Sequence, residues 1–507
     1  MNLAIQTPVR RLLTVITFVG LLLGAGIQKS AVAADSKPSF FPAALQVEGN
    51  NRVFSIGDDS TIMFSSLGKW PNQVCSSVED PLCDFNVTGR DKDGEALLAT
   101  ASLGVCDKSK NEDCVESIEI SRDGVSYSKL EFERNIPRSI GADNDGKEFP
   151  ANYAKFLPRG EMPTIWTEVQ DGKVSELKYL VNYGYYMYFN AQKKVFEISD
   201  IGLAIRPFKE VPGRVWASLW DTEVKSGIPY EFETGTSFRA VVHISNLAAG
   251  WFKARIKDPN IKIEPLTSRN NRLTISGTSV EVPNFAIVRS IETLNEREAA
   301  MAENFGYVKG VVNAASGVKE IFDYVDYFRP ILNDTAPRTN SYWSINSTQW
   351  SNQNRCLQDS SRVLGVVSTN AMGYDGTSPK FESGFLNYRV TGLHFAADGV
   401  TPNLGTYDLL LRSDAARCLY GFTKAPVSAS VSIVGGAGSQ NVATTVVSEK
   451  DGWLKLKAYG FTFSEKKIKV AFTQKSKKQS ITCVRGTVSK KITGTSPKCP
   501  AGFKVKR

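Results

Sequence analysis

The stretch YGYYMYF at 183–189 decides the fold, because it is the densest group of aromatic residues in the chain. Aromatic rings pack well on a pleated, half-buried surface, so this stretch is typical of a strand. Side chains alternate between the two faces of a strand, which places Tyr186 and Tyr188 on one face with Gly184. The opposite face suits a protein core, while Tyr186 and Tyr188 form a possible carbohydrate platform of rings with polar tips. The alternative is a strand buried on both faces.

The same β signals extend outward along the chain. Seven Asp-Gly steps, a sequence that suits tight hairpin turns, lie among β-branched and aromatic runs. Residues 467–473 alternate between polar and apolar, which predicts a half-buried strand. Further strands are expected at 116–120, 129–132, 194–198, 238–244 and 427–434. The pattern predicts a mostly β protein with two or three antiparallel β-sandwich-like domains.

One segment has a helical pattern instead. Between Glu292 and Phe328, apolar residues recur at steps of mostly three and four, which predicts one or two amphipathic helices that end before Pro330. A second row of small residues is typical of helices that associate in membranes; it consists of Ala302, Gly306, Gly310 and Ala314. Charged residues within the segment argue against a simple membrane span. We predict a helical connector and keep membrane activity as an alternative.

The first 34 residues match an export signal. Arg10 and Arg11 precede an uncharged apolar stretch of 16 residues, Leu12–Ile27, and 31-AVA-33 resembles a cleavage site. A helix of that length spans roughly 24 Å, which is shorter than the ~30 Å hydrocarbon core of a bilayer. We therefore expect a removed signal peptide over 1–34 rather than a membrane anchor, and an extracellular or cell-surface location.

Cysteine usage agrees with export. All eight cysteines follow the leader, and an even number in an oxidising compartment predicts disulfides. Their clustering favours neighbouring partners, and the expected pairs are Cys75 with Cys83, Cys106 with Cys114, Cys356 with Cys418, and Cys483 with Cys499. A metal site needs C-x-x-C pairs or histidine partners close by. Neither accompanies these cysteines, so no metal is predicted.

The net charge of +9 is concentrated near the C-terminus. Residues 464–507 contain thirteen Lys or Arg and one acid, which leaves 48 basic and 51 acidic side chains in 1–463. No basic stripe crosses the main body, so a nucleic-acid partner is not expected. The bases of the tail predict binding to anionic polymers; those from residue 475 onward are Lys475, Lys477, Lys478, Arg485, Lys490, Lys491, Lys498, Lys504, Lys506 and Arg507.

Length and composition predict about three globular domains at ~150 residues each. Boundaries are expected where strands give way to helix, at Pro-rich steps and where the charge changes. The predicted parts after the leader are an N-terminal β domain at 39–213, a small β domain at 214–288, the helical connector at 289–336, a C-terminal β domain at 338–474, and a basic disulfide tail at 475–507.

No complete catalytic motif is present. The two histidines, His243 and His394, lack partner motifs and are expected to make structural hydrogen bonds. The G-x-S-x-G elbow, the P-loop and H-E-x-x-H are absent from the sequence. No catalytic residue and no cofactor are therefore predicted. Paired carboxylates for glycoside hydrolysis stay open, because their separation is set by the fold.

The tail carries a resemblance. The sequences ITCVRG at 481–486, KKITG at 490–494 and PKCPAGFK at 497–504 resemble a short basic two-cysteine C-terminal module of exported bacterial proteins of unknown function. The preceding region, with CLY at 418–420 and GWLKL at 452–456, resembles β domains found beside such modules. The resemblance implies surface or extracellular residence and no particular reaction.

These observations favour a secreted or cell-surface protein with a binding or structural role rather than an enzymatic one. Its basic tail is expected to hold anionic envelope polymers while its β domains contact a polysaccharide or a protein. The first alternative is an extracellular polysaccharide-acting enzyme with paired carboxylates, either a hydrolase or a lyase. The second is a membrane-active protein that uses 292–328, which the charges in that segment disfavour.

Overall fold

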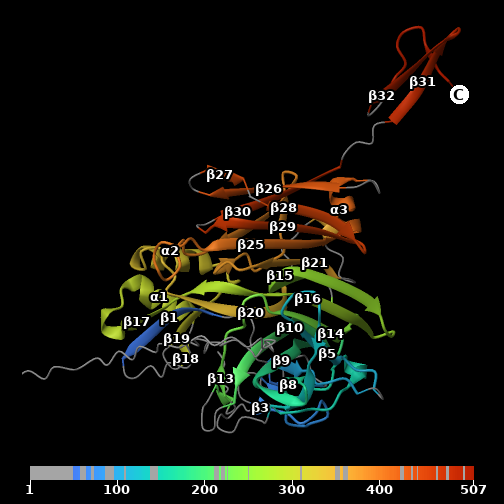
Figure 1. Ribbon diagram of the computed structural model, residues 1–507. Helices are drawn as coiled ribbons and strands as arrows, with labels where there is room; N and C mark the ends of the chain where they lie inside the picture. The colour runs from blue at the N-terminus through green and yellow to red at the C-terminus, as the bar shows by residue number, and fades with distance from the viewer. Residues whose placement is uncertain are drawn as a thin grey trace, which may run out of the picture. The chain divides into compact units, whose positions relative to one another are not determined.

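The computed structural model of the chain (Figure 1) describes residues 50–506 with internal gaps. The gaps are 58–63, 70–72, 86–95, 108–109, 137–146, 211–215, 218–222, 225–226, 249, 306, 309–310, 349–353, 358–362, 423–426, 436–437, 442–443, 464–465, 475–478 and 495–496. The predicted signal peptide lies outside the described residues, as do Lys475, Lys477, Lys478 and Arg507 of the tail. Strands make up most of what is described, which confirms the mostly β prediction.

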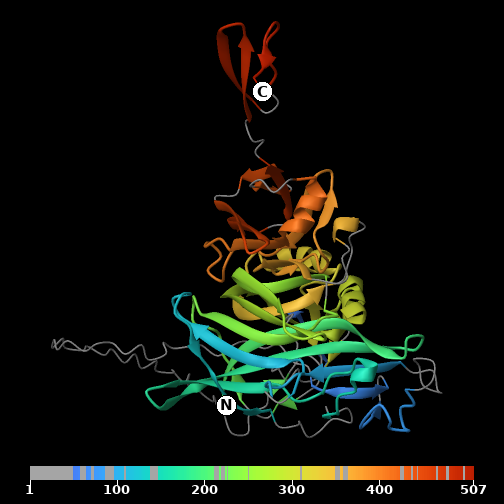
Figure 2. The same cartoon turned by 90° about the vertical axis from the view of Figure 1, so that its right-hand side faces the viewer.

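The first layer of an N-terminal sandwich is built on a long hairpin, visible in cyan and green in Figure 2. Strands β9 (Lys173–Asn190) and β10 (Val195–Lys209) pair along almost their whole length. The other edge of β9 pairs first with β8 (Thr164–Gln170) and then with β4 (Leu97–Ser102). Shorter strands extend this layer: β2 (Ser66–Lys69), β3 (Gln73–Val74), β7 (Glu131–Asn135) and β13 (Ile228–Pro229).

The second layer is centred on β14 (Ser237–Ser245), which lies between β5 (Cys114–Ser121) and β16 (Asn270–Asn284). Strand β15 (Gly250–Pro265) pairs with β16, and β6 (Ser128–Lys129) pairs with β5. Alternate residues of β9 and β14 fill the core between the layers, including Tyr183, Tyr185, Phe238 and Val242. The predicted sandwich is thereby confirmed, and its strands include the expected ones at 116–120, 194–198 and 238–244.

A central strand, β20 (Arg338–Thr348), pairs with β10, β15 and β16. Strand β15 also runs parallel to β21 (Val363–Thr369), and the ladder continues through β25 (Leu404–Arg412), β29 (Trp453–Thr462) and β28 (Thr444–Lys450). The predicted segments therefore share strand pairs across the expected boundaries near 213, 288 and 337. The division into domains stays a prediction.

A second sheet pairs β24 (Phe385–Thr391) with β30 (Lys466–Gln474) and β30 with β26 (Val427–Gly435). It also contains β22 (Gly373–Tyr374), β23 (Lys380–Glu382) and β27 (Gly438–Asn441). Ile468, Val470 and Phe472 of β30 are buried, as their alternation predicts, and pack with side chains of β25 and β29. Helix α3 (Ser413–Tyr420) and a single 3-10 turn at Arg355–Leu357 lie beside this core and are joined by the Cys356–Cys418 disulfide.

The predicted connector is only partly helical. Helices α1 (Glu296–Phe305) and α2 (Ile321–Ile331) are present, after a 3-10 turn at Ile291–Thr293. Between them lie β18 (Tyr307–Val308) and β19 (Val311–Ala315), and β19 pairs in parallel with β1 (Asn51–Gly57). β-Branched valines favour this strand. Of the predicted alternatives, two helices are found rather than one. Ala314 of the predicted row of small residues lies in β19, Gly306 and Gly310 lie outside the described residues, and α2 extends one residue past Pro330 instead of ending before it.

The apolar faces of α1 and α2 are covered. Their buried side chains, among them Met301, Tyr324 and Phe328, pack with Phe54 of β1 and Phe285. Phe285 is followed by β17 (Ala286–Ser290), which pairs with the other edge of β1. None of the described helices combines the length and the apolarity that a bilayer crossing requires.

The C-terminal residues form a small three-stranded sheet, which we call the C-terminal module, residues 479–506. Its strands are β31 (Gln479–Arg485), β32 (Val488–Gly494) and β33 (Lys504–Val505). Cys483 of β31 is bonded to Cys499 and is the only buried side chain among those described in the module. A separate pair, β11 (Trp216–Ala217) and β12 (Glu223–Val224), completes the described strands.

All four disulfides join the predicted partners. They are Cys75–Cys83, Cys106–Cys114, Cys356–Cys418 and Cys483–Cys499, and no described cysteine is free. The hairpin turns at Asp171-Gly172 and Asp451-Gly452 hold both residues at positive φ, between 49° and 80°. That is the turn geometry for which Asp-Gly is preferred.

Candidate functional site

A cavity of about 250 Å³ opens at one end of the N-terminal sandwich. Its lining comes from segments that are far apart in sequence: the loop before β5, the 3-10 turn at Tyr153–Lys155, strand β9, and the residues around the β15–β16 turn. Tyr185 and Met187 of β9 project into it from the core face of the strand. We call it the Asp113 cavity, because Asp113 is the only carboxylate among its lining residues in the described part of the chain.

The Asp113 carboxylate is held by neutral donors. The Tyr185 hydroxyl donates a hydrogen bond of 3.1 Å to Asp113 Oδ2. Burial raises the pKa of Asp113 to about 7, although hydrogen bonds from Tyr185 and Asn270 act in the opposite direction. The residue as a whole is partly exposed, and it lines the cavity. Asp113 is therefore an acidic group that exchanges a proton near neutral pH.

Two tyrosines behind Asp113 form a chain of hydroxyl groups. Tyr183 donates to the backbone oxygen of His243 at 2.9 Å, and the hydroxyl oxygens of Tyr183 and Tyr185 are 3.1 Å apart. Tyr185 also accepts from the backbone N–H of Ser245 at 2.9 Å. Tyr185 has one hydroxyl hydrogen but two possible acceptors, the Tyr183 hydroxyl oxygen and the Asp113 carboxylate. Each contact therefore has its own hydrogen only when Asp113 is protonated. Asp113 then donates to Tyr185, and Tyr185 donates to Tyr183.

The walls and the rim of the cavity are aromatic and apolar. The guanidinium of Arg269 lies 4.2 Å from the centre of the Tyr153 ring, a cation–π contact that holds both side chains at the entrance. Phe156 and Leu247 stand at the rim with 49% and 50% of their surface exposed. Large apolar side chains left open beside a buried polar group are typical of a ligand site.

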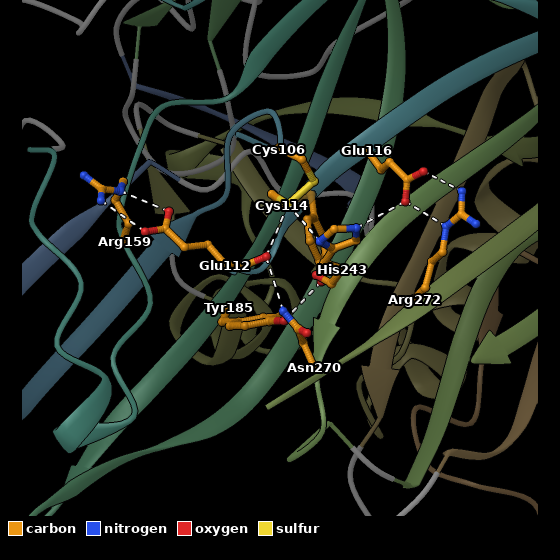
Figure 3. The surroundings of a disulfide bond; sticks show 10 residues. Cys106, Glu112, Cys114, Glu116, Arg159, Tyr185, His243, Asn270 and Arg272 are labelled. Carbon is orange, nitrogen blue, oxygen red and sulfur yellow. Dashed lines mark hydrogen bonds and ion pairs between the residues drawn. A yellow bond between two sulfur atoms is a disulfide. The ribbon is translucent and has the colours of Figure 1, made fainter. Parts of the chain in front are cut away.

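The loop that carries Asp113 is fixed on both sides (Figure 3). Arg159 donates two hydrogen bonds to the Glu112 carboxylate, at 3.1 and 3.2 Å. Cys106 and Cys114 close the loop covalently. The amide of Asn270, a buried residue, donates to the backbone oxygen of Glu112 at 3.4 Å. These contacts hold Asp113 in place before any ligand arrives.

His243 lies on the other side of the disulfide, as Figure 3 shows. Its Nδ1 atom is 3.3 Å from Cys114 Sγ, and its Nε2 atom is 3.2 Å from Glu116 Oε2. Burial alone would raise the pKa of Glu116, but the hydrogen bonds and charge of Arg272 lower it below its ordinary value. Glu116 is therefore an anion that accepts from both Arg272 and His243. His394 is similar in part, because its Nδ1 lies 3.0 Å from Asp334 Oδ2.

The predicted carbohydrate platform lies on the opposite face of β9. Tyr186 and Tyr188 point away from the cavity and are 36% and 42% exposed. Tyr188 donates to Glu197 of β10, which Lys193 also contacts at 2.7 Å. The strand is thus not buried on both faces at this end. The structure separates the platform from the Asp113 cavity and does not bring them into one site.

The described bases of the C-terminal module are all exposed. They are Arg485, Lys490, Lys491, Lys498, Lys504 and Lys506. Lys490 Nζ lies 5.3 Å from the centre of the Phe503 ring. Residues 479–506 contain no Asp or Glu, so the module presents positive charge that no acid within it neutralises.

A second, wider groove lies where β25 begins and β29 ends, and it has a volume of about 650 Å³. Its walls combine apolar residues with neutral hydroxyl and amide groups, and Glu281 is the only carboxylate among its described lining residues. Tyr459 in this wall donates to the buried Asp408 at 2.7 Å. Burial raises the pKa of Asp408 to about 7, against the hydrogen bonds from Tyr459 and the backbone of Asp258.

No family model, curated protein or solved structure matches this chain. The chemistry of the site therefore rests on its own residues. The Asp113 cavity offers one proton-exchanging carboxyl, a cluster of hydroxyl and amide groups, and aromatic walls. Sequence reasoning missed Asp113, Asn270 and Arg269, because they are ordinary polar residues in loops that only the sandwich brings together. Tyr185 was visible as an aromatic residue but not as part of a cavity.

Proposed function

We propose that this chain is an exported, cell-surface-associated binding protein that holds one saccharide unit in the Asp113 cavity. The observation that carries the proposal is the buried Asp113 carboxyl at the base of an aromatic-lined cavity. A carboxyl and an amide can exchange hydrogen bonds with neighbouring sugar hydroxyls, while tyrosine and phenylalanine rings pack on the apolar face of the sugar. Arg269 at the entrance adds a further donor.

The size of the cavity supports a small ligand. A volume of about 250 Å³ lies just below the usual ~300–1,000 Å³ of sites for drug-sized ligands. Such a space suits a single ring, for example a terminal unit of a glycan, better than an extended chain. The apolar rim of Phe156 and Leu247 is then available to the neighbouring unit.

The carboxylates favour binding over hydrolysis. Glycoside hydrolysis ordinarily needs two carboxyl groups about 5–10 Å apart, one on each side of the scissile bond. Asp113 is the only carboxylate described in the lining of its cavity, and Glu281 is the only one described in the wider groove. Glu112 is adjacent in sequence but is engaged by Arg159. We therefore place the binding proposal ahead of the enzymatic alternative.

We assign retention at the cell surface to the C-terminal module. Six described exposed bases and the absence of acids from 479–506 support attraction to anionic polymers, which salt should weaken. Four disulfides fit an oxidising compartment. The ligand cavity and the retaining charges thus lie in separate elements, which allows each to be tested alone.

The saccharide proposal is tested by screening the full mature chain on a glycan array, beside the Asp113→Asn variant and the Tyr186→Ala/Tyr188→Ala variant. We expect wild type to bind a defined terminal sugar, Asp113→Asn to lose that signal, and the double tyrosine variant to retain it. Binding that follows the tyrosines rather than Asp113 would move the site to the outer face of β9. A blank array for wild type would refute the saccharide proposal.

Retention is tested on purified cell envelope. We expect the full chain to sediment with envelope at low salt, to be released as salt rises, and to stop sedimenting when Lys475–Arg507 is deleted. The deletion variant should still bind the glycan found in the first experiment. Sedimentation that survives the deletion would remove the retaining role of the module.

A further inference from the structure

The Cys106–Cys114 disulfide lies against a histidine in an arrangement found nowhere else in the described part of the chain. One ligand atom each from Cys106, Cys114 and His243 lies within 4.8 Å of the others. Cys114 and His243 are direct partners across β5 and β14. Cys75–Cys83 has the same spacing of eight residues, but no histidine or acid completes such a group beside it among the described residues.

The hydrogen-bond partners fix the tautomer of neutral His243. Glu116 lies 3.2 Å from Nε2 and accepts two hydrogen bonds from the Arg272 guanidinium, so its carboxylate faces His243 as an acceptor. The ring proton must then lie on Nε2. The lone pair of Nδ1 therefore faces the sulfur of Cys114 at 3.3 Å.

This is the arrangement that a metal-binding histidine needs. A ligating imidazole commonly donates its second ring N–H to a carboxylate, which fixes its orientation and strengthens it as a ligand. In a tetrahedral zinc site, sulfur and nitrogen lie about 2.3 and 2.0 Å from the ion, and therefore about 3.5 Å from each other. The separation of 3.3 Å between Cys114 Sγ and His243 Nδ1 is already close to that value.

We propose that the reduced chain binds one Zn²⁺ through Cys106, Cys114 and His243, with Glu116 as the orienting carboxylate. A dithiol reductant transfers two electrons and two protons to the disulfide and is itself oxidised to a disulfide, which leaves two thiols. Zn²⁺ then replaces the two thiol protons, which pass to water, and takes the imidazole as its third ligand. The fourth position is left to water or to an outside ligand.

The loop between Cys106 and Cys114 can therefore be closed either by a disulfide or by a metal ion. In the oxidised chain the sulfur–sulfur bond closes the loop that carries Asp113. In the reduced chain, the metal closes the same loop through the same sulfur atoms. Cys106 is partly exposed while Cys114 is buried, so we expect the reductant to attack the sulfur of Cys106. The sulfur of Cys114 is then the leaving group, and it is released beside His243.

The experiment measures zinc binding by the full mature chain before and after treatment with a dithiol, followed by removal of the dithiol without air. We expect no site in the oxidised chain and one Zn²⁺ per reduced chain. Replacement of zinc by Co²⁺ should give a thiolate-to-cobalt absorption band. Mass spectrometry should show that Zn²⁺ protects Cys106 and Cys114 from alkylation.

Variants assign the ligands. Cys106→Ser/Cys114→Ser and His243→Ala should abolish the site or weaken it more than 100-fold, and Glu116→Gln should weaken it by about 10- to 100-fold, as loss of an orienting carboxylate does. Glu119→Gln is the matched control, because Glu119 lies on the same strand and pairs with Arg239 at 2.7 Å. Cys356→Ser/Cys418→Ser should likewise leave zinc binding unchanged.

Three outcomes would overturn the proposal. The first is a reduced wild-type chain that binds no zinc although circular dichroism shows it folded. The second is zinc affinity that His243→Ala leaves unchanged. The third is protection from alkylation at cysteines other than Cys106 and Cys114. The alkylation map uses wild type alone, so the proposal stays testable even if a variant fails to fold.

Discussion

Two buried carboxyls, Asp113 and Asp408, have the same surroundings in different parts of the chain. Each accepts from a tyrosine hydroxyl, at 3.1 Å for Asp113 and 2.7 Å for Asp408. Burial raises the pKa of both to about 7. They differ in access, because Asp113 lines a cavity whereas the Asp408 side chain lies behind Tyr459 and is almost fully buried. We propose a binding role only for Asp113, because Asp408 lies behind Tyr459.

At about pH 8, above its pKa of about 7, Asp113 is charged. Asp113→Asn should then weaken saccharide binding by about 10- to 100-fold, because a hydrogen bond to a charged group contributes roughly 1.5–3 kcal/mol. The amide keeps the size of the side chain but presents only one acceptor oxygen. Calorimetric titration of the full chain with the glycan found on the array measures the loss. Asp107→Asn, an exposed change in the same disulfide-closed loop, should leave the affinity unchanged. Equal affinities for wild type and Asp113→Asn would contradict the assignment.

Asp408 should make the folded chain less stable as the pH rises. Its pKa is about 7 when folded and ~3.9 when unfolded, so the folded state binds more protons between these values. The stability contributed by the protonated form is full below pH ~4 and is lost as the pH rises to about 7. Asp408→Asn should reduce the loss between pH 5 and 7.5 by roughly 1–2 kcal/mol.

Chemical denaturation at several pH values measures this effect. The matched control is Asp451→Asn, which makes the same change in an exposed hairpin turn that asparagine tolerates. We expect the control to keep the full pH dependence of wild type. A profile for Asp408→Asn that matches wild type would show that Asp408 does not titrate in this range.

Sequence alone predicts some of these residues and not others. Tyr186 and Tyr188 are visible because strand alternation depends only on local order. Asp113 is not visible, because its raised pKa comes from neighbours such as Tyr185 and Asn270, which lie 72 and 157 positions further along. His243 is similar: its position in a strand was predictable, but its contact with Cys114 depends on the pairing of β5 with β14.

At the scale of secondary-structure elements, regular local sequence patterns predicted strands and turns most reliably. The alternation at 467–473 became β30, and the Asp-Gly steps at 171 and 451 became hairpin turns. The helical spacing of 292–328 was right for α1 and α2 but wrong between them. Val311 and Val312 fit a helical step of apolar residues equally well, and the edge of β1 decided in favour of a strand. Partner strands of this kind cannot be read from local spacing.

The C-terminal module should depend on its disulfide. A sheet of under 30 residues with one buried side chain has little core, and such small units usually need a covalent link. Closing the loop between Cys483 and Cys499 contributes roughly 3 kcal/mol in the chain-entropy model. Cys483→Ser/Cys499→Ser should therefore unfold the module and leave the rest of the chain folded.

Limited proteolysis followed by mass spectrometry tests this expectation. Cleavage should appear within 479–506 in the variant and be much slower in wild type. The N-terminal sandwich should resist cleavage equally in both proteins. A module that stays resistant without its disulfide would show that the three strands suffice.

For the whole molecule, sheet pairing is wider than the domains expected from sequence. Strand β20 follows all three predicted boundaries, yet it pairs with β10, which precedes the boundary near 213, and with β15 and β16, which precede the boundary near 288. Composition and Pro-Gly steps mark where the chain turns, but they do not show which strands share a ladder. The fold class was therefore predictable, while the strand pairing between the predicted segments was not.

The four disulfides should also differ in their resistance to reduction. Thiol exchange requires access to a sulfur atom, and Cys75 and Cys83 are both fully buried in the sandwich core. Cys418 is exposed, and Cys106 and Cys499 are partly exposed. We expect Cys75–Cys83 to be the last pair reduced in the folded chain. Stepwise reduction with alkylation at each step, read by mass spectrometry, would contradict this if Cys75 or Cys83 were labelled first.

Strand β9 lines the cavity with Tyr185 and Met187 on one face and exposes Tyr186 and Tyr188 on the other, so the two pairs alternate along the strand. Inserting or deleting a single residue between the Asp171-Gly172 turn and Tyr185 would rotate every following side chain to the wrong side. Tyr186 would then be forced into the Asp113 cavity, and Tyr185 would lose its hydrogen bond to Asp113. Sequence changes that keep both surfaces of this strand are therefore substitutions, or insertions and deletions of two residues. The same limit applies to any redesign of either surface.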